Sequence, residues 1–128
     1  MLGLPANLEK KMDQPVAIFG SGISGLGVAE LLKKLNWEYD FYDRDGTEFT
    51  EKEAEKSSIV ITSPGFTLDH NWIKIAEENK LSIYGEMDFA SIFCKNPMVA
   101  ITGTNGKTTL VTRLSHLLNK LGRSSLFV

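Results

Sequence analysis

The stretch Val16-Ala-Ile-Phe-Gly-Ser-Gly-Ile-Ser-Gly25 decides the fold of this chain. Its first four residues are apolar and predict a short buried strand. The next six place glycines at 20, 22 and 25 in the pattern G-x-G-x-x-G, and residues 26–35 continue with apolar side chains at helical period. A strand, a glycine turn and a helix in this order are typical of a nucleotide-binding βα unit.

The same alternation continues to about residue 95. Short apolar runs predict further strands, and the segments between them predict amphipathic helices. The regular alternation predicts an α/β fold with a Rossmann-like parallel sheet. The expected strands cover residues 37–42, 58–62 and 81–84, and the expected helices cover residues 50–56, 71–79 and 86–93.

A second pattern begins after Lys95, Asn96 and Pro97, which predict a hinge because proline biases its predecessor away from helix. We expect a strand over 98–102, a loop over 103–106, a helix over 107–121 and the start of a strand over 126–128. Residues 1–95 are therefore expected to form one complete domain. Residues 96–128 are expected to be the first βα unit of a second, truncated domain, which makes the chain a fragment.

The first glycine cluster has a physical task for each glycine. These tasks are a tight turn, close approach of the backbone to a phosphate, and close packing of helix on strand. Asp43 ends the second expected strand, 23 residues after Gly20, where an acid commonly meets a ribose hydroxyl. The alternative is a glycine-rich helix entry used for packing alone, with Asp43 as a cap. Strand, helix and acid in register favour a nucleotide site.

The second glycine cluster reads Thr102-Gly-Thr-Asn-Gly-Lys-Thr-Thr109. Gly106, Lys107 and Thr108 match the end of the phosphate-loop pattern G-x-x-x-x-G-K-[ST], whereas Ile101 stands where that pattern has its first glycine. Such a loop wraps backbone N–H groups round phosphate oxygens. A polar turn with an exposed lysine would leave unexplained why glycine, lysine and two hydroxyls converge at one helix start. The cluster therefore predicts binding of ATP and Mg²⁺, and it makes residues 96–128 the expected start of a truncated ATPase domain.

Composition narrows the class of protein. The 128 residues are 42% apolar and 23% charged with a net charge of −2, which is typical of a globular protein and excludes a broad basic face for nucleic acid. One cysteine, Cys94, excludes an internal disulfide, and it is expected to be half-buried. No stretch predicts a signal peptide or a membrane span. We expect a cytoplasmic monomer without nucleic-acid or membrane partners.

Three polar residues near helix starts have structural explanations. His70 precedes an expected helix and is expected to have a capping or a surface role, since it has no metal-spaced partner. Glu86 and Asp88 fall in the first turn of an expected helix, where the helix dipole favours carboxylates.

Four landmarks in order resemble those of the muramoyl-peptide ligases. They are Gly20–Gly25, Ser63-Pro64-Gly65, Gly85-Glu-Met-Asp-Phe89 and Ala100–Thr109. The family's ATP loop has the form T-G-[ST]-N-G-K-[ST]-T, which accommodates Ile101. The resemblance covers nearly the whole chain. Its S-P-G turn favours the member that adds D-glutamate over the relative that adds L-alanine.

The resemblance implies roles for individual residues. Contacts to the UDP part of the substrate are expected from Gly22, Ile23, Ser24, Asp43, Arg44, Ser63, Pro64 and Gly65. Contacts to ATP are expected from Gly103, Thr104, Asn105, Gly106, Lys107, Thr108 and Thr109. Lys107 is the expected catalytic residue, and Thr108 is the expected Mg²⁺ ligand.

The reaction that the resemblance implies is an ATP-dependent amide ligation. ATP phosphorylates the alanine carboxylate of UDP-N-acetylmuramoyl-L-alanine, and the amine of D-glutamate displaces phosphate from the acyl phosphate. The second metal site and the adenine and glutamate sites are expected beyond Val128. Three alternatives stay open: the L-alanine-adding ligase, a nicotinamide or flavin oxidoreductase fragment, and a non-catalytic nucleotide-binding module.

Overall fold

The computed structural model describes residue 8 and residues 13–125. The chain divides into two compact units, with the boundary between Cys94 and Lys95. The described strands all belong to the first unit, and the second holds helix α6 (Lys107–Lys120). No helix among the described residues is both long and apolar enough to cross a bilayer.

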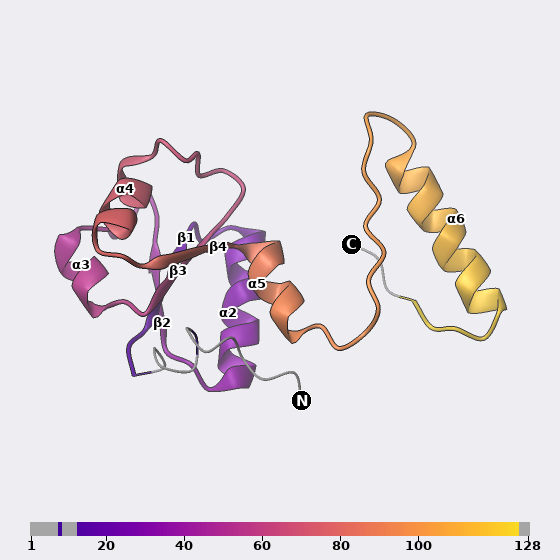
Figure 1. Ribbon diagram of the computed structural model, residues 1–128, viewed down its shortest axis with the longest axis horizontal. Helices are drawn as coiled ribbons and strands as arrows, with labels where there is room; N and C mark the ends of the chain where they lie inside the picture. The colour runs from indigo at the N-terminus through magenta and orange to yellow at the C-terminus, as the bar shows by residue number, and fades with distance from the viewer. Residues whose placement is uncertain (1–7, 9–12, 126–128) are drawn as a thin grey trace. The chain divides into compact units, whose positions relative to one another are not determined.

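The first unit is a parallel sheet with helices on both faces (Figure 1). Its strands lie in the order β2-β1-β3-β4, and each neighbouring pair is parallel. The expected α/β fold with a Rossmann-like parallel sheet is therefore confirmed. The strands are β1 (Val16–Phe19), β2 (Tyr39–Tyr42), β3 (Ile59–Thr62) and β4 (Ser82–Gly85). The helices are α2 (Ile23–Leu35), α3 (Glu51–Lys56), α4 (Asn71–Glu78) and α5 (Glu86–Phe93).

Two element boundaries differ from the expected ones for local reasons. Helix α2 starts at Ile23, three residues before the expected start, because Gly22 already has the extended backbone of an N-cap (φ −70°, ψ −172°). Strand β2 starts at Tyr39 and not at Trp37, because the Trp37 N–H donates to the Leu32 carbonyl (3.0 Å) and so completes the end of helix α2.

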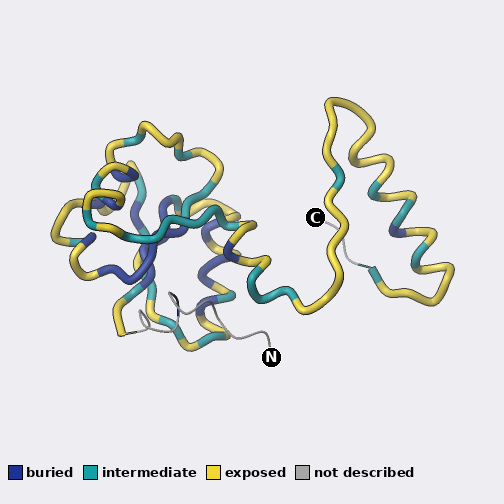
Figure 2. The backbone as a smooth tube through the Cα atoms, viewed as in Figure 1, coloured by how far each residue is buried: buried dark blue, intermediate teal, exposed yellow. Residues whose placement is uncertain are grey.

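Strand β1 supplies side chains to two apolar cores, one on each face of the sheet. Val16 and Ile18 pack with α2 and α5, whereas Ala17 and Phe19 pack with α3 and α4. None of the four is more than 2% exposed, and the buried strand crosses the middle of the unit in Figure 2. A central parallel strand covered on both faces reads as a continuous apolar run, which is why this stretch of sequence predicts the sheet.

Phe19, the last residue of β1, is the centre of an aromatic cluster. Its ring centroid lies 4.7 Å from that of Phe49, 5.4 Å from that of Trp72 and 5.5 Å from that of Phe66. Phe66 belongs to the loop after β3, so this packing fixes that loop to the end of β1.

The second unit differs from the expected βα unit. Helix α6 is present, but residues 98–102 form no strand, so the strand expected over Met98–Thr102 is wrong. A strand exists through hydrogen bonds to a neighbouring strand, and this segment has no such partner among the described residues of its unit. The strand expected over Leu126–Val128 lies outside the described residues.

We predict that the first unit folds without the second, because its sheet and both cores are built from its own residues. Lys95 to Ala100 are exposed and belong to no helix or strand, so brief digestion with trypsin should cut first after Lys95. Mass spectrometry of the early fragments checks this. Lys33 and Lys34, which are also exposed but helical, serve as internal controls. Early cleavage at those two lysines would contradict the division.

Candidate functional site

The carboxyl ends of β1 and β3 form a switch point in the sheet. The chain passes from β1 to β2 on one side and then crosses to β3 on the other, so the loops after β1 and β3 lead to helices on opposite faces. The Ser63 N–H donates to the Phe19 carbonyl (3.1 Å), and the Gly20 N–H donates to the Tyr42 carbonyl (2.9 Å). In open parallel sheets, ligands bind in the crevice outside such a point.

The three glycines of the first cluster meet different surroundings. Gly20 turns the chain with φ +99°, a value that L side chains rarely adopt. A Cβ on Gly25 would lie 2.0 Å from the Gly20 carbonyl oxygen, so only glycine lets α2 approach the turn this closely. A Cβ on Gly22 would meet no atom within 4 Å. The backbone at Gly22 is therefore open to a ligand.

The start of α2 offers unpaired backbone donors beside this opening. The first N–H groups of any helix lack partners within the helix, and α2 has neither a side-chain cap nor an acid in its first turn. Ile23 is 93% exposed and Ser24 is exposed as well. The positive end of the helix dipole at this position suits an anion such as a diphosphate.

Asp43 follows β2 and binds the glycine loop. Its Oδ2 accepts hydrogen bonds from the Ser21 N–H (2.9 Å) and from the Ser21 hydroxyl (2.6 Å), and its Oδ1 accepts one from the Arg44 N–H (2.7 Å). These bonds, the Ser21 hydroxyl first, hold the pKa of Asp43 below its ordinary value. The carboxylate therefore stays ionised and connects the loop after β1 to the loop after β2.

The Ser63-Pro64-Gly65 segment forms a turn that the Phe66 N–H closes on the Ser63 carbonyl (3.1 Å). The Ser63 hydroxyl faces the glycine loop, since its oxygen lies 3.0 Å from the position of a Cβ on Gly20. The Arg44 guanidinium carbon lies 6.0 Å from the centre of the Phe66 ring. The residues expected to contact UDP thus gather at one edge of the sheet, on the loops after β1, β2 and β3.

The second glycine cluster lies in the second unit and precedes α6. Gly103 (φ +148°) and Gly106 (φ +77°) both have backbone conformations that favour glycine, and Gly106 caps the helix without a side-chain hydrogen bond. The Lys107 ammonium donates to the Gly103 carbonyl. Lysine and loop therefore form a closed turn with free N–H groups at the helix start.

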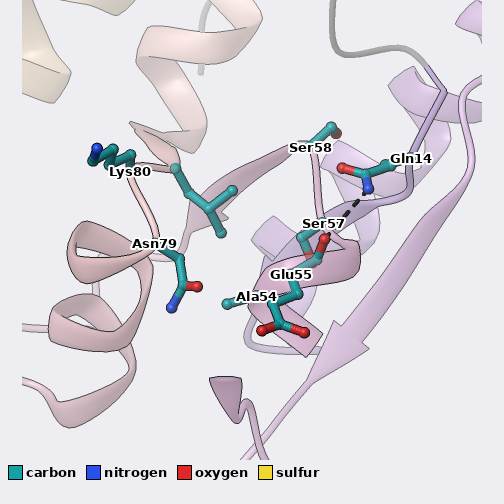
Figure 3. A pocket seen from close by; sticks show the side chains of 8 residues that line it. Gln14, Ala54, Glu55, Ser57, Ser58, Asn79 and Lys80 are labelled. Atoms are coloured by element: carbon teal, nitrogen blue, oxygen red, sulfur yellow. Dashed lines mark hydrogen bonds between the residues drawn. The ribbon is translucent and has the colours of Figure 1, made fainter. Parts of the chain in front are cut away.

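A hollow of about 300 Å³ lies at the opposite edge of the sheet (Figure 3). Its residues precede β1, β3 and β4, so it faces away from the loops described above. Its two side-chain amides bond within the protein: the Gln14 amide donates to the Glu55 carbonyl (3.3 Å), and the Asn79 amide donates to the Ile75 carbonyl (2.9 Å). It is lined by Gln14, Ala54, Glu55, Ser57, Ser58, Asn79, Lys80 and Leu81. It is not the candidate site.

The sequence reasoning missed Ser21 and Phe66. A hydroxyl inside a glycine loop was the available signal for Ser21, and an aromatic directly after Ser-Pro-Gly was the signal for Phe66. Of the capping and surface roles expected for His70, the structure shows the cap, because its Nδ1 accepts a hydrogen bond from the Trp72 N–H (3.2 Å). Glu86 does start α5, but its Oε2 is shielded from solvent and has no hydrogen-bond partner in the described structure.

Metal ligands do not cluster in the described part of the chain. Among residue 8 and residues 13–125, no three or more His, Cys, Asp or Glu side chains are placed to hold a metal ion. Cys94 is half-buried, as expected.

The fold and the loops define a Rossmann-like α/β protein with a glycine loop at the switch point of its sheet. No protein-family model matches the chain. It is similar to proteins named UDP-N-acetylmuramoylalanine--D-glutamate ligase from a Thermoanaerobacter species (32% identity over 84% of this chain), Christiangramia forsetii (30% over 89%) and Thermus thermophilus (33% over 82%). The expected resemblance to this ligase family is therefore confirmed. The chain spans 28–30% of the length of these relatives.

Substituting alanine for Gly25 should destabilise the first unit by about 1–3 kcal/mol or more, because the new Cβ would overlap the Gly20 carbonyl oxygen. Gly27→Ala is the matched control. Gly27 is an exposed glycine in the same helix, and a Cβ there meets nothing within 4 Å. That change should stabilise the protein by about 0.5–1 kcal/mol through helix propensity. Urea denaturation measures both, and equal effects of the two substitutions would refute the packing argument.

Proposed function

We propose that the chain is the N-terminal part of an ATP-dependent ligase that joins D-glutamate to UDP-N-acetylmuramoyl-L-alanine in peptidoglycan precursor synthesis. The observation that carries the proposal is the presence of two glycine loops, one in each unit, in a chain whose relatives bear this ligase name. One loop suits a nucleotide-linked substrate and the other suits ATP. We place the reaction in the cytoplasm, where ATP is available.

The UDP part of the substrate is proposed to bind at the switch point of the first unit. The open backbone at Gly22 and the start of α2 at Ile23 and Ser24 would donate N–H groups to the diphosphate. The turn at Ser63, Pro64 and Gly65 would close the other side, and the Ser63 hydroxyl already faces the glycine loop at Gly20. Arg44, held beside Phe66, would add a positive charge next to the anion.

ATP is proposed to bind at the loop formed by Gly103, Thr104, Asn105, Gly106, Lys107, Thr108 and Thr109. The loop fits a phosphate chain because a Cβ at Gly106 would meet nothing within 4 Å and α6 has no side-chain cap, so its first N–H groups are accessible. Lys107 would exchange the Gly103 carbonyl for a phosphate oxygen, and the Thr108 hydroxyl would ligate Mg²⁺. When bound, ATP would supply the phosphoryl group that activates the alanine carboxylate, and Mg²⁺ would neutralise charge on the phosphate oxygens. The acyl phosphate would then yield the amide when the D-glutamate amine displaces phosphate.

The alternatives are less well supported. A nicotinamide or flavin oxidoreductase needs the acid after β2 for a ribose, but Asp43 already accepts three hydrogen bonds from Ser21 and Arg44. It also has no use for the loop around Lys107. The L-alanine-adding ligase is disfavoured because the relatives carry the D-glutamate name.

The 128-residue chain should bind UDP and not NAD. Calorimetric titration with each nucleotide checks this, and tight NAD binding without UDP binding would overturn the assignment.

Ser63→Ala should weaken UDP binding by about 1.5–3 kcal/mol, the value of one hydrogen bond to a charged group. Gly22→Val should abolish binding by blocking the open backbone while leaving the fold intact. Ser91→Ala is the control, because it also removes an exposed hydroxyl. That hydroxyl donates to the Asp88 carbonyl within helix α5 and belongs to none of the three loops of the proposed site.

Lys107→Ala in the complete ligase should lower the rate roughly 10²-fold or more, as for loss of one preorganised donor to developing charge. Lys107→Arg should rescue poorly, because a planar fork does not replace a compact ammonium in a tight loop. The assay is phosphate release that requires both D-glutamate and UDP-N-acetylmuramoyl-L-alanine. Lys120→Ala, at the far end of α6, is the control. The 128 residues by themselves should give no turnover, and an unimpaired Lys107→Ala enzyme would falsify the proposed role.

A further inference from the structure

Ser21 is the one polar side chain of the first glycine cluster that the proposed substrate contacts leave without a role. It is exposed, and both its N–H (2.9 Å) and its hydroxyl (2.6 Å) donate to Oδ2 of Asp43. The two residues are 22 positions apart and belong to different loops. This pair is therefore a cross-link between the loops after β1 and β2.

The hydrogen bonds use most of the acceptor capacity of Asp43. A carboxylate has two oxygens with about four acceptor positions. Ser21 occupies two of them and the Arg44 N–H occupies a third at 2.7 Å. An acid that recognises a ribose must instead turn its oxygens toward the ligand. Asp43 turns its oxygens toward its own protein.

The cross-link fixes Ser21 directly beside the backbone that is proposed to bind the diphosphate. Ser21 lies between Gly20, which needs its unusual φ of +99° to turn the chain, and Gly22, whose open backbone is proposed to meet the diphosphate. Glycines on both sides give this segment more conformational freedom than other residues would. Fixing Ser21 from outside the loop reduces the conformational freedom that ligand binding would otherwise have to remove.

We propose that Ser21 and Asp43 are positioning residues, which clamp the glycine loop in the shape that binds the nucleotide, and that Asp43 does not recognise the ribose. This inference rests on the proposed binding of UDP at the switch point. The lowered pKa of Asp43, caused first by the Ser21 hydroxyl, agrees with a carboxylate that remains ionised within the clamp.

A double-mutant cycle on UDP affinity tests the clamp in the 128-residue chain. Ser21→Ala should weaken UDP binding roughly 2- to 10-fold, the range for one hydrogen bond. The same change made in an Asp43→Ala chain should alter affinity less than about twofold, because the serine acts only through the acid. Ser21→Thr, which keeps a hydroxyl, should restore binding. Ser91→Ala is the matched control and should have no effect.

A second ligand separates positioning from direct recognition of the sugar. If Asp43 acts through the loop, Asp43→Ala should weaken UDP and 2′-deoxy-UDP by the same factor. A change in their affinity ratio would assign Asp43 to the 2′-hydroxyl and overturn the inference, as would equal effects of Ser21→Ala in the wild-type and Asp43→Ala chains. Absence of UDP binding by the wild-type chain would instead refute the proposed function, and the clamp with it. Thermal unfolding of each variant confirms that the compared proteins are folded.

Discussion

The close approach of helix α2 to the end of β1 is the constraint on which the rest of the first unit depends. The Gly20 carbonyl oxygen lies 2.0 Å from where a Cβ on Gly25 would be, a separation that no other residue at position 25 permits. This contact lets Val28 and Leu32 reach the core beside Ile18. It also places the start of α2 directly beyond the carboxyl end of the central strand. The close contact between Gly20 and Gly25 therefore determines both the packing of α2 on the sheet and the position of the candidate site.

The parallel sheet assembles the site from segments far apart in the sequence. Parallel strands bring their carboxyl ends to one edge, so the loops after β1, β2 and β3 meet although they span residues 20–66. Phe19 fixes the third loop through Phe66, and Asp43 fixes the first loop through Ser21. Aromatic packing thus fixes the loop after β3, and hydrogen bonds fix the loop after β1. A ligand at this edge meets a preformed surface, which lowers the entropic cost of binding.

The sequence predicted the sheet well because its strands are short apolar runs that the glycine and polar turns separate. It also predicted the three tasks of the glycines, two of which depend on backbone conformation and packing and are visible in the structure at Gly20 and Gly25. It did not predict that strand β2 begins only at Tyr39, since the Trp37 N–H bonds back to the Leu32 carbonyl at the end of α2. Nor did it predict the absence of a strand at residues 98–102, because pairing depends on a neighbour and not on the segment itself. The Ser21–Asp43 bond escaped prediction for a related reason: a side-chain contact between two loops has no periodic pattern in the sequence.

The central claim is that the carboxyl edge of the sheet, and not the hollow at its opposite edge, binds a uridine nucleotide. Mapping of backbone amide shifts by NMR during titration with UDP tests this most directly, because it locates the ligand without any substitution. The account predicts saturable shifts confined to the segments around Gly22, Arg44 and Ser63. Shifts concentrated at Ser57, Ser58 and Lys80, which line the hollow, would contradict it.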